Sequence, residues 1–250
     1  MTADASQLTD AAAPASGALA VLRDKALRDK ALRAGSELEG APPQEILCWA
    51  LGEFHPDLVI ASSMGDAVLV DMAAKIQPGV PVLFLDTGYH FAETIGTRDA
   101  VATVYPVDIV TVLPLATVAE QDAEHGPDLW QRQPDLCCAL RKVEPLARGL
   151  SPYTAWASGI RRDEATTRRT IGVVEWDEKR SMVKVNPLAG WTQDQVDAYI
   201  ADNGVLVNTL AYDGYPSIGC APCTRRVAPG EDPRAGRWAG TGKTECGLHI

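Results

Sequence analysis

The run Leu58-Val59-Ile60-Ala61-Ser62-Ser63-Met64-Gly65-Asp66 decides the fold. Its first four residues are apolar, which is typical of a short strand buried inside a sheet. A Ser/Gly turn follows, and residues 67–73 have helical character. A strand, a turn and a helix start direct free backbone N–H groups and the positive helix end at an anion. Many such turns carry Ser and Gly, so the run alone predicts a βα unit and leaves the anion site open.

The same alternation continues along the chain. Apolar runs at 80–85, 105–113, 153–157 and 183–188 predict further strands, and a helix from 193 to 202 follows Thr192 as its N-cap. Four or five strands alternating with helices predict an α/β fold with a mostly parallel sheet flanked by helices.

Polar motifs stand where two of these strands end. Leu85-Asp86-Thr87-Gly88 closes the run 80–85, and Gly159-Ile160-Arg161-Arg162 follows the run 153–157. Open α/β sheets bind ligands at the carboxyl ends of their strands. Arginine suits a tetrahedral oxyanion because its planar fork stays charged. A structural turn and a solvated charged face are the alternatives for these motifs.

Four cysteines form two pairs, the tandem Cys137-Cys138 and the CxxC pair Cys220 and Cys223. A disulfide between neighbouring cysteines closes a strained ring, so Cys137 and Cys138 are poor disulfide partners for each other. Four thiolates around one point suit a tetrahedral zinc or an iron–sulfur cluster, and structural disulfides are a weaker alternative. Cys48, between Leu47 and Trp49, is predicted to be a buried and inert thiol.

Composition narrows the function classes. A formal charge of −10 opposes general nucleic-acid binding, although arginines gather at 161–169 and 225–237 in a pattern that suits a small polyanion. No apolar run is long enough for a membrane span, and the first twenty residues do not have the pattern of a secretory signal. We therefore expect a cytoplasmic protein, in which clustered cysteines usually serve metal binding or catalysis.

The chain divides into three predicted parts. Residues 1–43 are an extension, disordered to about residue 18 and then a surface helix built on the repeat Leu-Arg-Asp-Lys-Ala. Gly35, Gly40 and Pro42-Pro43 are expected to end this helix. Residues 44–214 form the α/β nucleotide-binding domain. Residues 215–250 are irregular and carry the second cysteine pair, a Gly-rich hinge at 240–243 and a catalytic tail.

With the terminal Glu245-Cys246-Gly247-Leu248-His249, the two cysteine pairs resemble the assimilatory adenylyl-sulfate (APS) reductases. These are the cluster-containing branch of the phosphoadenylyl-sulfate reductase family, and the resemblance covers roughly residues 45–250. It implies a PP-loop, adenine nucleotide hydrolase-like fold. It also implies a [4Fe-4S] cluster on Cys137, Cys138, Cys220 and Cys223, with Cys246 as the nucleophile and His249 supporting it.

The resemblance further implies which residues contact the substrate. They lie in the phosphate loop, the Leu85–Gly88 motif, the segment after the cysteine pair, the Gly159–Arg162 motif and the stretch before the tail: Ser62, Ser63, Gly65, Leu85, Asp86, Thr87, Gly88, Lys142, Gly159, Arg161, Arg162, Arg234 and Arg237.

The implied reaction is the reduction of APS to sulfite and AMP through an S-sulfocysteine on Cys246. One cysteine lies outside the quartet and the apolar Cys48 context, so an external dithiol such as thioredoxin or a glutaredoxin-like protein is expected. Neither a nucleic acid nor a membrane is an expected partner, and the sequence leaves homo-oligomer formation open.

Three rivals remain at this point. A reductase of 3′-phosphoadenylyl sulfate (PAPS), or one that uses both substrates, is the closest, although PAPS-specific members typically lack both cysteine pairs. A PP-loop ATP pyrophosphatase would have a fuller SGGxDS-like loop than residues 62–66. A zinc-stabilised binding module would not need the separate Cys246.

Overall fold

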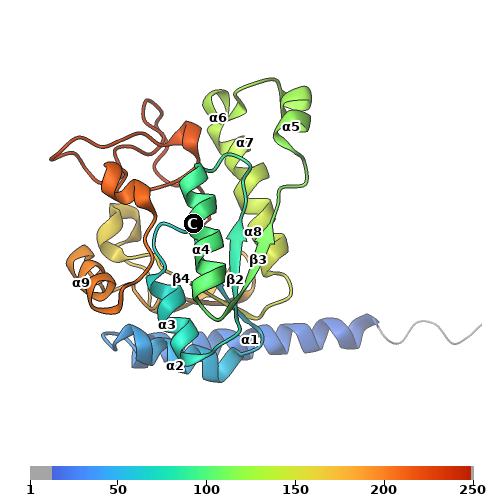
Figure 1. The fold of residues 1–250 in the computed structure, drawn as a ribbon. Coiled ribbons are helices and arrows are strands. Elements are labelled where there is room, and N and C mark those ends of the chain that lie inside the picture. The colour runs from blue at the N-terminus through green and yellow to red at the C-terminus, as the bar shows by residue number, and fades with distance from the viewer. Residues whose placement is uncertain (1–12, 249–250) are drawn as a thin grey trace, which may run out of the picture.

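The computed structural model describes residues 13–248, with side chains from residue 19 onward. Six strands form one sheet in the order β3-β2-β1-β4-β6-β5 (Figure 1). The strands are β1 (Leu58–Ala61), β2 (Val80–Leu85), β3 (Val107–Val112), β4 (Ala155–Ser158), β5 (Val174–Asp177) and β6 (Met182–Val185). Neighbours pair in parallel except β5, which is antiparallel to β6. The mostly parallel α/β prediction is confirmed, and the edge strand β5 was not predicted.

Helices cover both faces of the sheet. In the described part of the chain they are α1 (Ala13–Glu37), α2 (Pro43–Phe54), α3 (Val68–Ile76), α4 (Ala92–Val104), α5 (Val118–His125), α6 (Leu129–Arg132), α7 (Pro134–Cys138), α8 (Glu144–Leu150) and α9 (Gln193–Asn203). The predicted cap of α9 is present, since Thr192 Oγ1 accepts from the Gln195 N–H and the Gln195 side chain accepts from Thr192 N–H.

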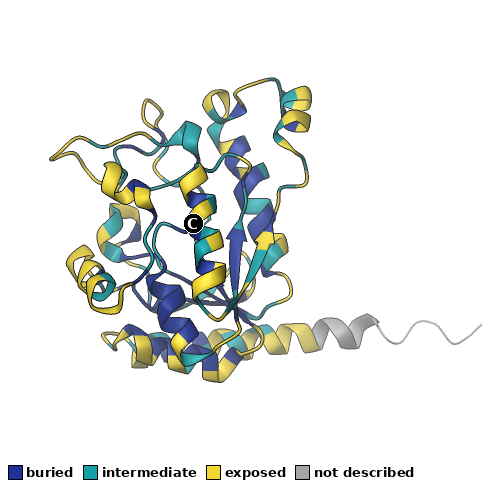
Figure 2. Cartoon of the chain, in the orientation of Figure 1, coloured by how far each residue is buried: buried dark blue, intermediate teal, exposed yellow. Residues whose placement is uncertain are grey.

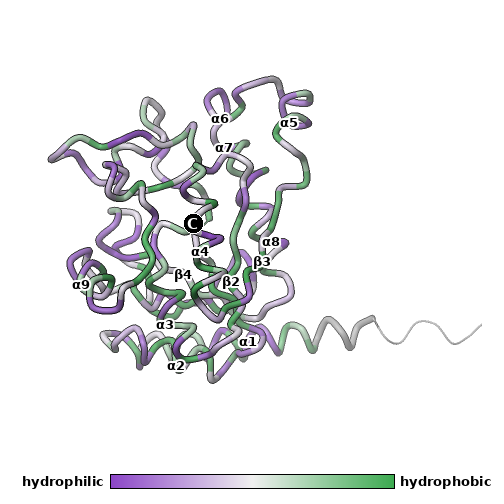
Figure 3. Tube along the Cα trace, in the orientation of Figure 1, coloured by the Kyte–Doolittle hydropathy of each residue, from purple (hydrophilic) through white to green (hydrophobic). Residues whose placement is uncertain are grey.

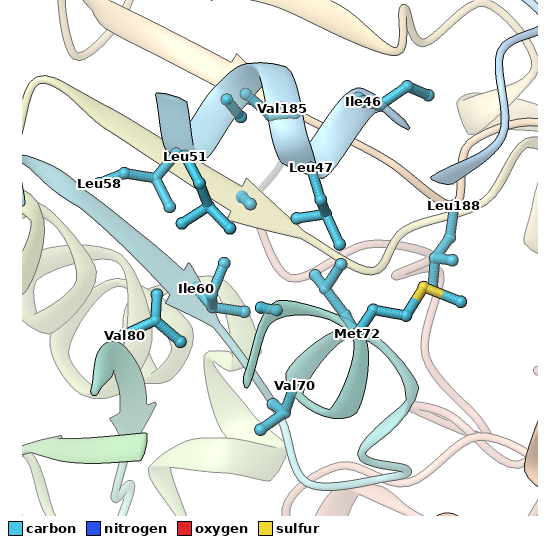
Figure 4. Close-up of a cluster of buried hydrophobic side chains, with 14 of the residues drawn as sticks. Ile46, Leu47, Leu51, Leu58, Ile60, Val70, Met72, Val80, Val185 and Leu188 are labelled. Atoms are coloured by element: carbon cyan, nitrogen blue, oxygen red, sulfur yellow. The ribbon is translucent and has the colours of Figure 1, made fainter. Parts of the chain in front are cut away.

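The larger core lies between one face of the sheet and the helices α2 and α3. Figure 4 shows Leu47 of α2 pointing toward Met72 of α3, with Ile60 of β1 beside them, and these three side chains and Ile46 are buried. Hydrophobic residues concentrate in the strands and α3 (Figure 3). The strands β1, β4 and β6 and the helix α3 are mostly buried, whereas β3 is partly exposed (Figure 2). Removing this apolar surface from water at about 25 cal/mol per Å² is the main stabilising contribution to the fold.

A smaller core covers the opposite face. Successive strand residues point to opposite sides of a sheet. Val59 therefore faces away from the larger core and packs with Trp156 of β4 and Leu146 of α8. Leu248, the last described residue, packs against the same cluster. The tail is therefore anchored at this residue on the α8 side of the sheet.

The strand order places a crevice beside β1. From β1 the chain builds outward to β2 and β3, and it then returns to place β4 on the other side of β1. Ligands of open α/β sheets bind at such a switch point, beyond the carboxyl ends of the two diverging strands. The phosphate-loop candidates follow β1 and the Gly159–Arg162 motif follows β4, so the topology brings these two motifs together.

Two sequence expectations, for Gly35 and for Cys48, are wrong. Gly35 lies inside α1, which ends at Glu37, just before the predicted breakers Gly40 and Pro42-Pro43. Glycine suits position 35 because a Cβ there would collide with the Val174 carbonyl where α1 packs on β5. Cys48 is exposed, since it lies on the outer face of α2 while Leu47 faces the core.

The predicted surface helix is present, and α1 reaches past the rest of the protein at its start (Figure 1), with Leu22 and Leu32 exposed. The disorder predicted for residues 1–18 is wrong for residues 13–18, which belong to α1, and the rest of that prediction falls on residues 1–12, outside the described residues. Between residues 13 and 248, no helix has both the length and the apolar character needed to span a bilayer.

Candidate active site

A cavity of about 290 Å³ lies at the carboxyl ends of β1, β2 and β4. Residues from every segment that was predicted to contact the substrate line it. The predicted site residues among them are Ser62, Ser63, Gly65, Leu85, Thr87, Lys142, Gly159, Arg161, Arg234, Arg237 and Cys246. Segments as far apart in sequence as the β1 turn and the tail thus share one cavity.

The turn after β1 is held in a fixed shape from two sides. Ser62 Oγ accepts from the Met64 N–H at 3.2 Å, and Asp66 Oδ1 accepts from Val68 N–H at 3.0 Å at the start of α3. Asn208, fully buried, donates to the Met64 carbonyl from its side chain. Sequence reasoning missed Asn208, because nothing local links it to a turn that lies 144 residues away.

The Leu85–Gly88 motif forms a second tight turn at the cavity edge. Asp86 Oδ1 accepts from the Gly88 N–H at 3.0 Å, and Gly88 has a φ of +72°. Among the described residues, Asp86 and Gly88 therefore shape the turn without lining the cavity. His90 does line it and was assigned no role; burial lowers its pKa, which favours the neutral ring.

The arginines after β4 point to different places. Arg161 is buried, lines the cavity and donates to Gln193 Oε1 at 2.6 Å. Arg162 turns away and forms a bidentate ion pair with Glu39 at 2.7 and 2.8 Å. Its predicted substrate contact does not fit this position, because its guanidinium is committed to the chain's N-terminal side. Arg168, which was not singled out, lines the cavity instead.

The two cysteine pairs meet beside the main cavity. Cys137, Cys138, Cys220 and Cys223 line one small cavity with Tyr89, Trp130, Pro134, Arg141 and Lys142. All six cysteines of the chain are free, so the disulfide alternative is wrong. Burial and the facing sulfurs raise the pKa of Cys137 to about 12 and that of Cys223 to about 11. Four thiols gathered at one cavity are a donor set suited to a soft metal centre.

The arrangement of these sulfurs also bears on what they could hold. Within the described ranges, no group of three or more His, Cys, Asp or Glu side chains is set up for a metal ion. A zinc ion and an iron–sulfur cluster are both held by four thiolates that face one space. Cys137, Cys138, Cys220 and Cys223 face one small cavity, so they are the residues that could hold either centre.

Two cations lie between this cysteine cavity and the larger one. Lys142 is buried and lines both; burial opposes its charge, but the thiols of Cys220 and Cys246 outweigh burial and raise its pKa. Arg141 donates to the Thr87 carbonyl and lies 5.2 Å from the Tyr89 ring. Thr87 Oγ1 lies 3.3 Å from Cys220 Sγ, which links the turn after β2 directly to the cysteine quartet.

The tail brings the remaining thiol into the cavity. Cys246 lines it, and the neighbouring Glu245 carboxylate pairs with Arg168 at 2.9 Å and Arg234 at 3.3 Å. Arg237 donates to Ser217 Oγ at 3.1 Å and lies 4.6 Å from the Trp238 ring. His249, the predicted support for Cys246, lies outside the described residues.

The comparisons with known proteins match this geometry. The model of the phosphoadenosine phosphosulfate reductase domain matches residues 57–226, most of the chain. The chain belongs to the phosphoadenosine phosphosulfate reductase family. Its members are oxidoreductases, and the resemblance seen in the sequence is confirmed.

Curated relatives place the chain within the family. A protein of Streptomyces coelicolor named adenosine 5′-phosphosulfate reductase is 60% identical, over 89% of this chain and 94% of its own length. Proteins of the same name from Mycolicibacterium smegmatis and Mycobacterium tuberculosis are 58% and 53% identical, covering 90% and 94% of this chain and 95% and 99% of their own.

Solved structures agree on the fold. The phosphoadenylyl-sulfate reductase of Candida auris, a phosphate complex, superposes with a TM-score of 0.67 at 32% identity, over 79% of this chain and 97% of that one. The FMN adenylyltransferase of Candida glabrata has a TM-score of 0.53 at 13% identity, over 79% of this chain and 66% of that one, and shows the shared nucleotide-binding fold alone.

Proposed function

We propose that this reductase converts adenylyl sulfate to sulfite and AMP, with Cys246 as the nucleophile, in assimilatory sulfate reduction in the cytoplasm. The observation that carries the proposal is the position of Cys246, which lines the same cavity as the β1 phosphate loop and Lys142. The relatives named adenosine 5′-phosphosulfate reductase support the choice of substrate.

In the first step the Cys246 thiolate attacks the sulfur of the bound phosphosulfate. An S–S bond forms, the bond from sulfur to the bridging oxygen breaks, and AMP leaves with that electron pair. Lys142 and Arg237 suit this step because their charges act on both the thiolate and the leaving phosphate. Ser62, Ser63 and Gly65 would hold the phosphate at the start of α3.

In the second step an external dithiol, thioredoxin or a similar protein, attacks Cys246 Sγ. The S–S bond to the sulfonate breaks and sulfite leaves, and the second thiol of the reductant then frees Cys246 from the mixed disulfide. The two electrons come from the dithiol. Cys246 is partly exposed, so a protein reductant has a route to it once the tail moves.

The cysteine quartet would hold a [4Fe-4S] cluster beside the cavity, where it supplies charge and position to the substrate site. Lys142 lines both cavities and so relates the quartet to the substrate. Finding bound iron and acid-labile sulfide with visible absorbance in the purified protein would support the cluster. A colourless protein that contains zinc would contradict it and favour a zinc-stabilised module.

The test compares sulfite release from APS and from PAPS, with thioredoxin, by wild type and Cys246→Ser. The variant should keep its iron and bind APS but lose turnover, and Cys48→Ser is the matched control because Cys48 is exposed on α2. Turnover by Cys246→Ser would disprove the nucleophile. Faster release from PAPS would favour the second candidate, which the 32% identity to a PAPS reductase keeps in view.

A further inference from the structure

We propose that Arg180 is a positioning residue that docks the C-terminal tail on the β5–β6 hairpin and thereby aims Cys246 into the cavity. The proposal rests on the function proposed above, since it gives the nucleophile its place.

Arg180 is held ready for this contact by its own hairpin. It lies in the turn between β5 and β6, where its Nη1 donates to Asp177 Oδ2 at 2.8 Å and its backbone N–H donates to Asp177 Oδ1 at 3.2 Å. Both side chains are less than one-tenth exposed, at 9% and 8%. The guanidinium carbon lies 5.6 Å from the centre of the buried Trp156 ring, so the arginine has little freedom to move.

The free end of this guanidinium reaches the tail. Arg180 Nη2 donates to the Leu248 carbonyl at 3.1 Å, across 68 residues of sequence. A charged donor makes this hydrogen bond stronger than one between neutral groups. It satisfies a carbonyl that belongs to no helix or strand.

The Leu248 side chain provides a second contact at the same place. It packs against the smaller core, in which Trp156, Leu146 and Met182 are buried. Met182 begins β6 and Trp156 also contacts Arg180, so one surface receives both the carbonyl and the side chain of Leu248. We call Arg180 and these three apolar residues the tail socket.

The socket and the Arg168 ion pair hold the tail on both sides of Cys246. Glu245 is fixed by Arg168 and Leu248 by the socket, and Gly247 between them has a φ of +79°. A left-handed residue turns the chain sharply there, which is why glycine suits the position. Fixing both neighbours leaves the Cys246 side chain few directions other than into the cavity.

Arg180 does not line the cavity in the described structure, so it acts through the tail and not on the substrate. Losing it should lower kcat and leave the KM for APS nearly unchanged. A tail that undocks more often should also expose the Cys246 thiol to reagents when no substrate is present.

The experiment measures alkylation of Cys246 by iodoacetamide in the cluster-containing full chain without substrate. Cleavage by trypsin after Lys243 releases residues 244–250, so mass spectrometry reads this thiol separately from Cys48. In the Arg180→Ala variant Cys246 should be alkylated at least about fivefold faster than in wild type. This factor corresponds to roughly 1 kcal/mol in the free energy of tail docking. Lys179→Ala, an exposed neighbour in the same turn, should match wild type.

A second variant, Leu248→Ala, changes the tail and leaves the hairpin intact, so it tests the socket even if Arg180→Ala folds poorly. Faster alkylation in both variants, with lower kcat and unchanged KM in Arg180→Ala, supports the proposal. Wild-type alkylation rates in Leu248→Ala, or a higher KM with normal kcat in a folded Arg180→Ala, would overturn it. Alkylation needs no turnover, so a failure of APS reduction would count against the proposed function alone.

Discussion

Arg168 grips Glu245 with two parallel hydrogen bonds, Nε to Oε1 and Nη2 to Oε2, both at 2.9 Å. The two side chains are 11% and 7% exposed, so the pair is largely removed from solvent. Arg168 also donates to Glu164 of the loop after β4 at 2.5 Å. The residue next to the proposed nucleophile is thus tied to an arginine of the proposed substrate cavity.

Glu245→Gln should lower kcat by about tenfold or more. The substitution removes the charge of Glu245 and leaves Arg168 without this buried partner, which costs several kcal/mol. The docked tail is then less stable, and Cys246 spends less time in the cavity. Steady-state kinetics of sulfite release with APS measure this. The matched control is Glu231→Gln, an exposed acid of the same C-terminal segment that pairs with Arg225. Equal kcat values for Glu245→Gln and wild type would contradict the prediction.

Lowering the pH should weaken the ion pair between Glu245 and Arg168. Burial opposes the Glu245 charge, but the hydrogen bond and charge of Arg168 and the charge of Arg234 outweigh it and lower the pKa. A carboxylate with a lowered folded pKa stabilises the docked state above its ordinary pKa, and this stability is lost as pH falls through the lowered value. The docked tail should therefore lose stability as the pH falls below about 4.5.

This loss can be followed with 4,4′-dithiodipyridine, a disulfide that still reacts with thiols in acid. The ratio of Cys246 to Cys48 modification should rise in wild type as pH falls below about 4.5. Glu245→Gln should show a high ratio at every pH, since it has no charge to lose. Circular dichroism checks that the fold persists, and a ratio independent of pH in folded wild type would count against the ion pair.

Local patterns in the sequence were sufficient to predict the parallel strands and the two cysteine pairs. β1 and β2 were predicted at their observed bounds, because each is a short apolar run that ends in polar turn residues. β5 was missed since Val174-Glu175-Trp176-Asp177 mixes charged and apolar residues, as an edge strand with one face packed on α1 can.

The sequence alone could not show which arginines after β4 line the cavity. Arg162 and Arg168 both follow β4 in a basic stretch, and which one lines the cavity depends on two short 3₁₀ turns between them. Glu39 then captures Arg162 and Glu245 captures Arg168. These partners lie 123 and 77 residues away, so only the folded chain decides the outcome.

Gly149→Ala should destabilise the fold. A Cβ at this position of α8 would lie 2.8 Å from Leu83 Cδ1 and 2.9 Å from Val112 Cγ2, both in the smaller core. Overpacking of this kind costs about 1–3 kcal/mol. Chemical denaturation should show a lower unfolding free energy, whereas Gly96→Ala, in α4 with open space around the new methyl, should be neutral or stabilising. Equal stability of the two variants would mean that α8 does not pack this closely.

Gly219→Ala should weaken substrate binding without unfolding the protein. Gly219 precedes Cys220, and a Cβ there would lie 2.6–2.8 Å from the Arg237 guanidinium, which the Trp238 ring at 4.6 Å also contacts. The colliding atoms are the end of a flexible side chain, so Arg237 would move while the backbone and the cysteine quartet stay in place. Losing one charged contact to an oxyanion should raise the KM for APS by about tenfold, since such hydrogen bonds contribute roughly 1.5–3 kcal/mol.

Gly52→Ala, with open space around the new methyl in α2, is the control for Gly219→Ala. An unchanged KM would mean that Arg237 does not contact the substrate from this position, and loss of iron together with activity would mean that Gly219 shapes the cysteine site instead.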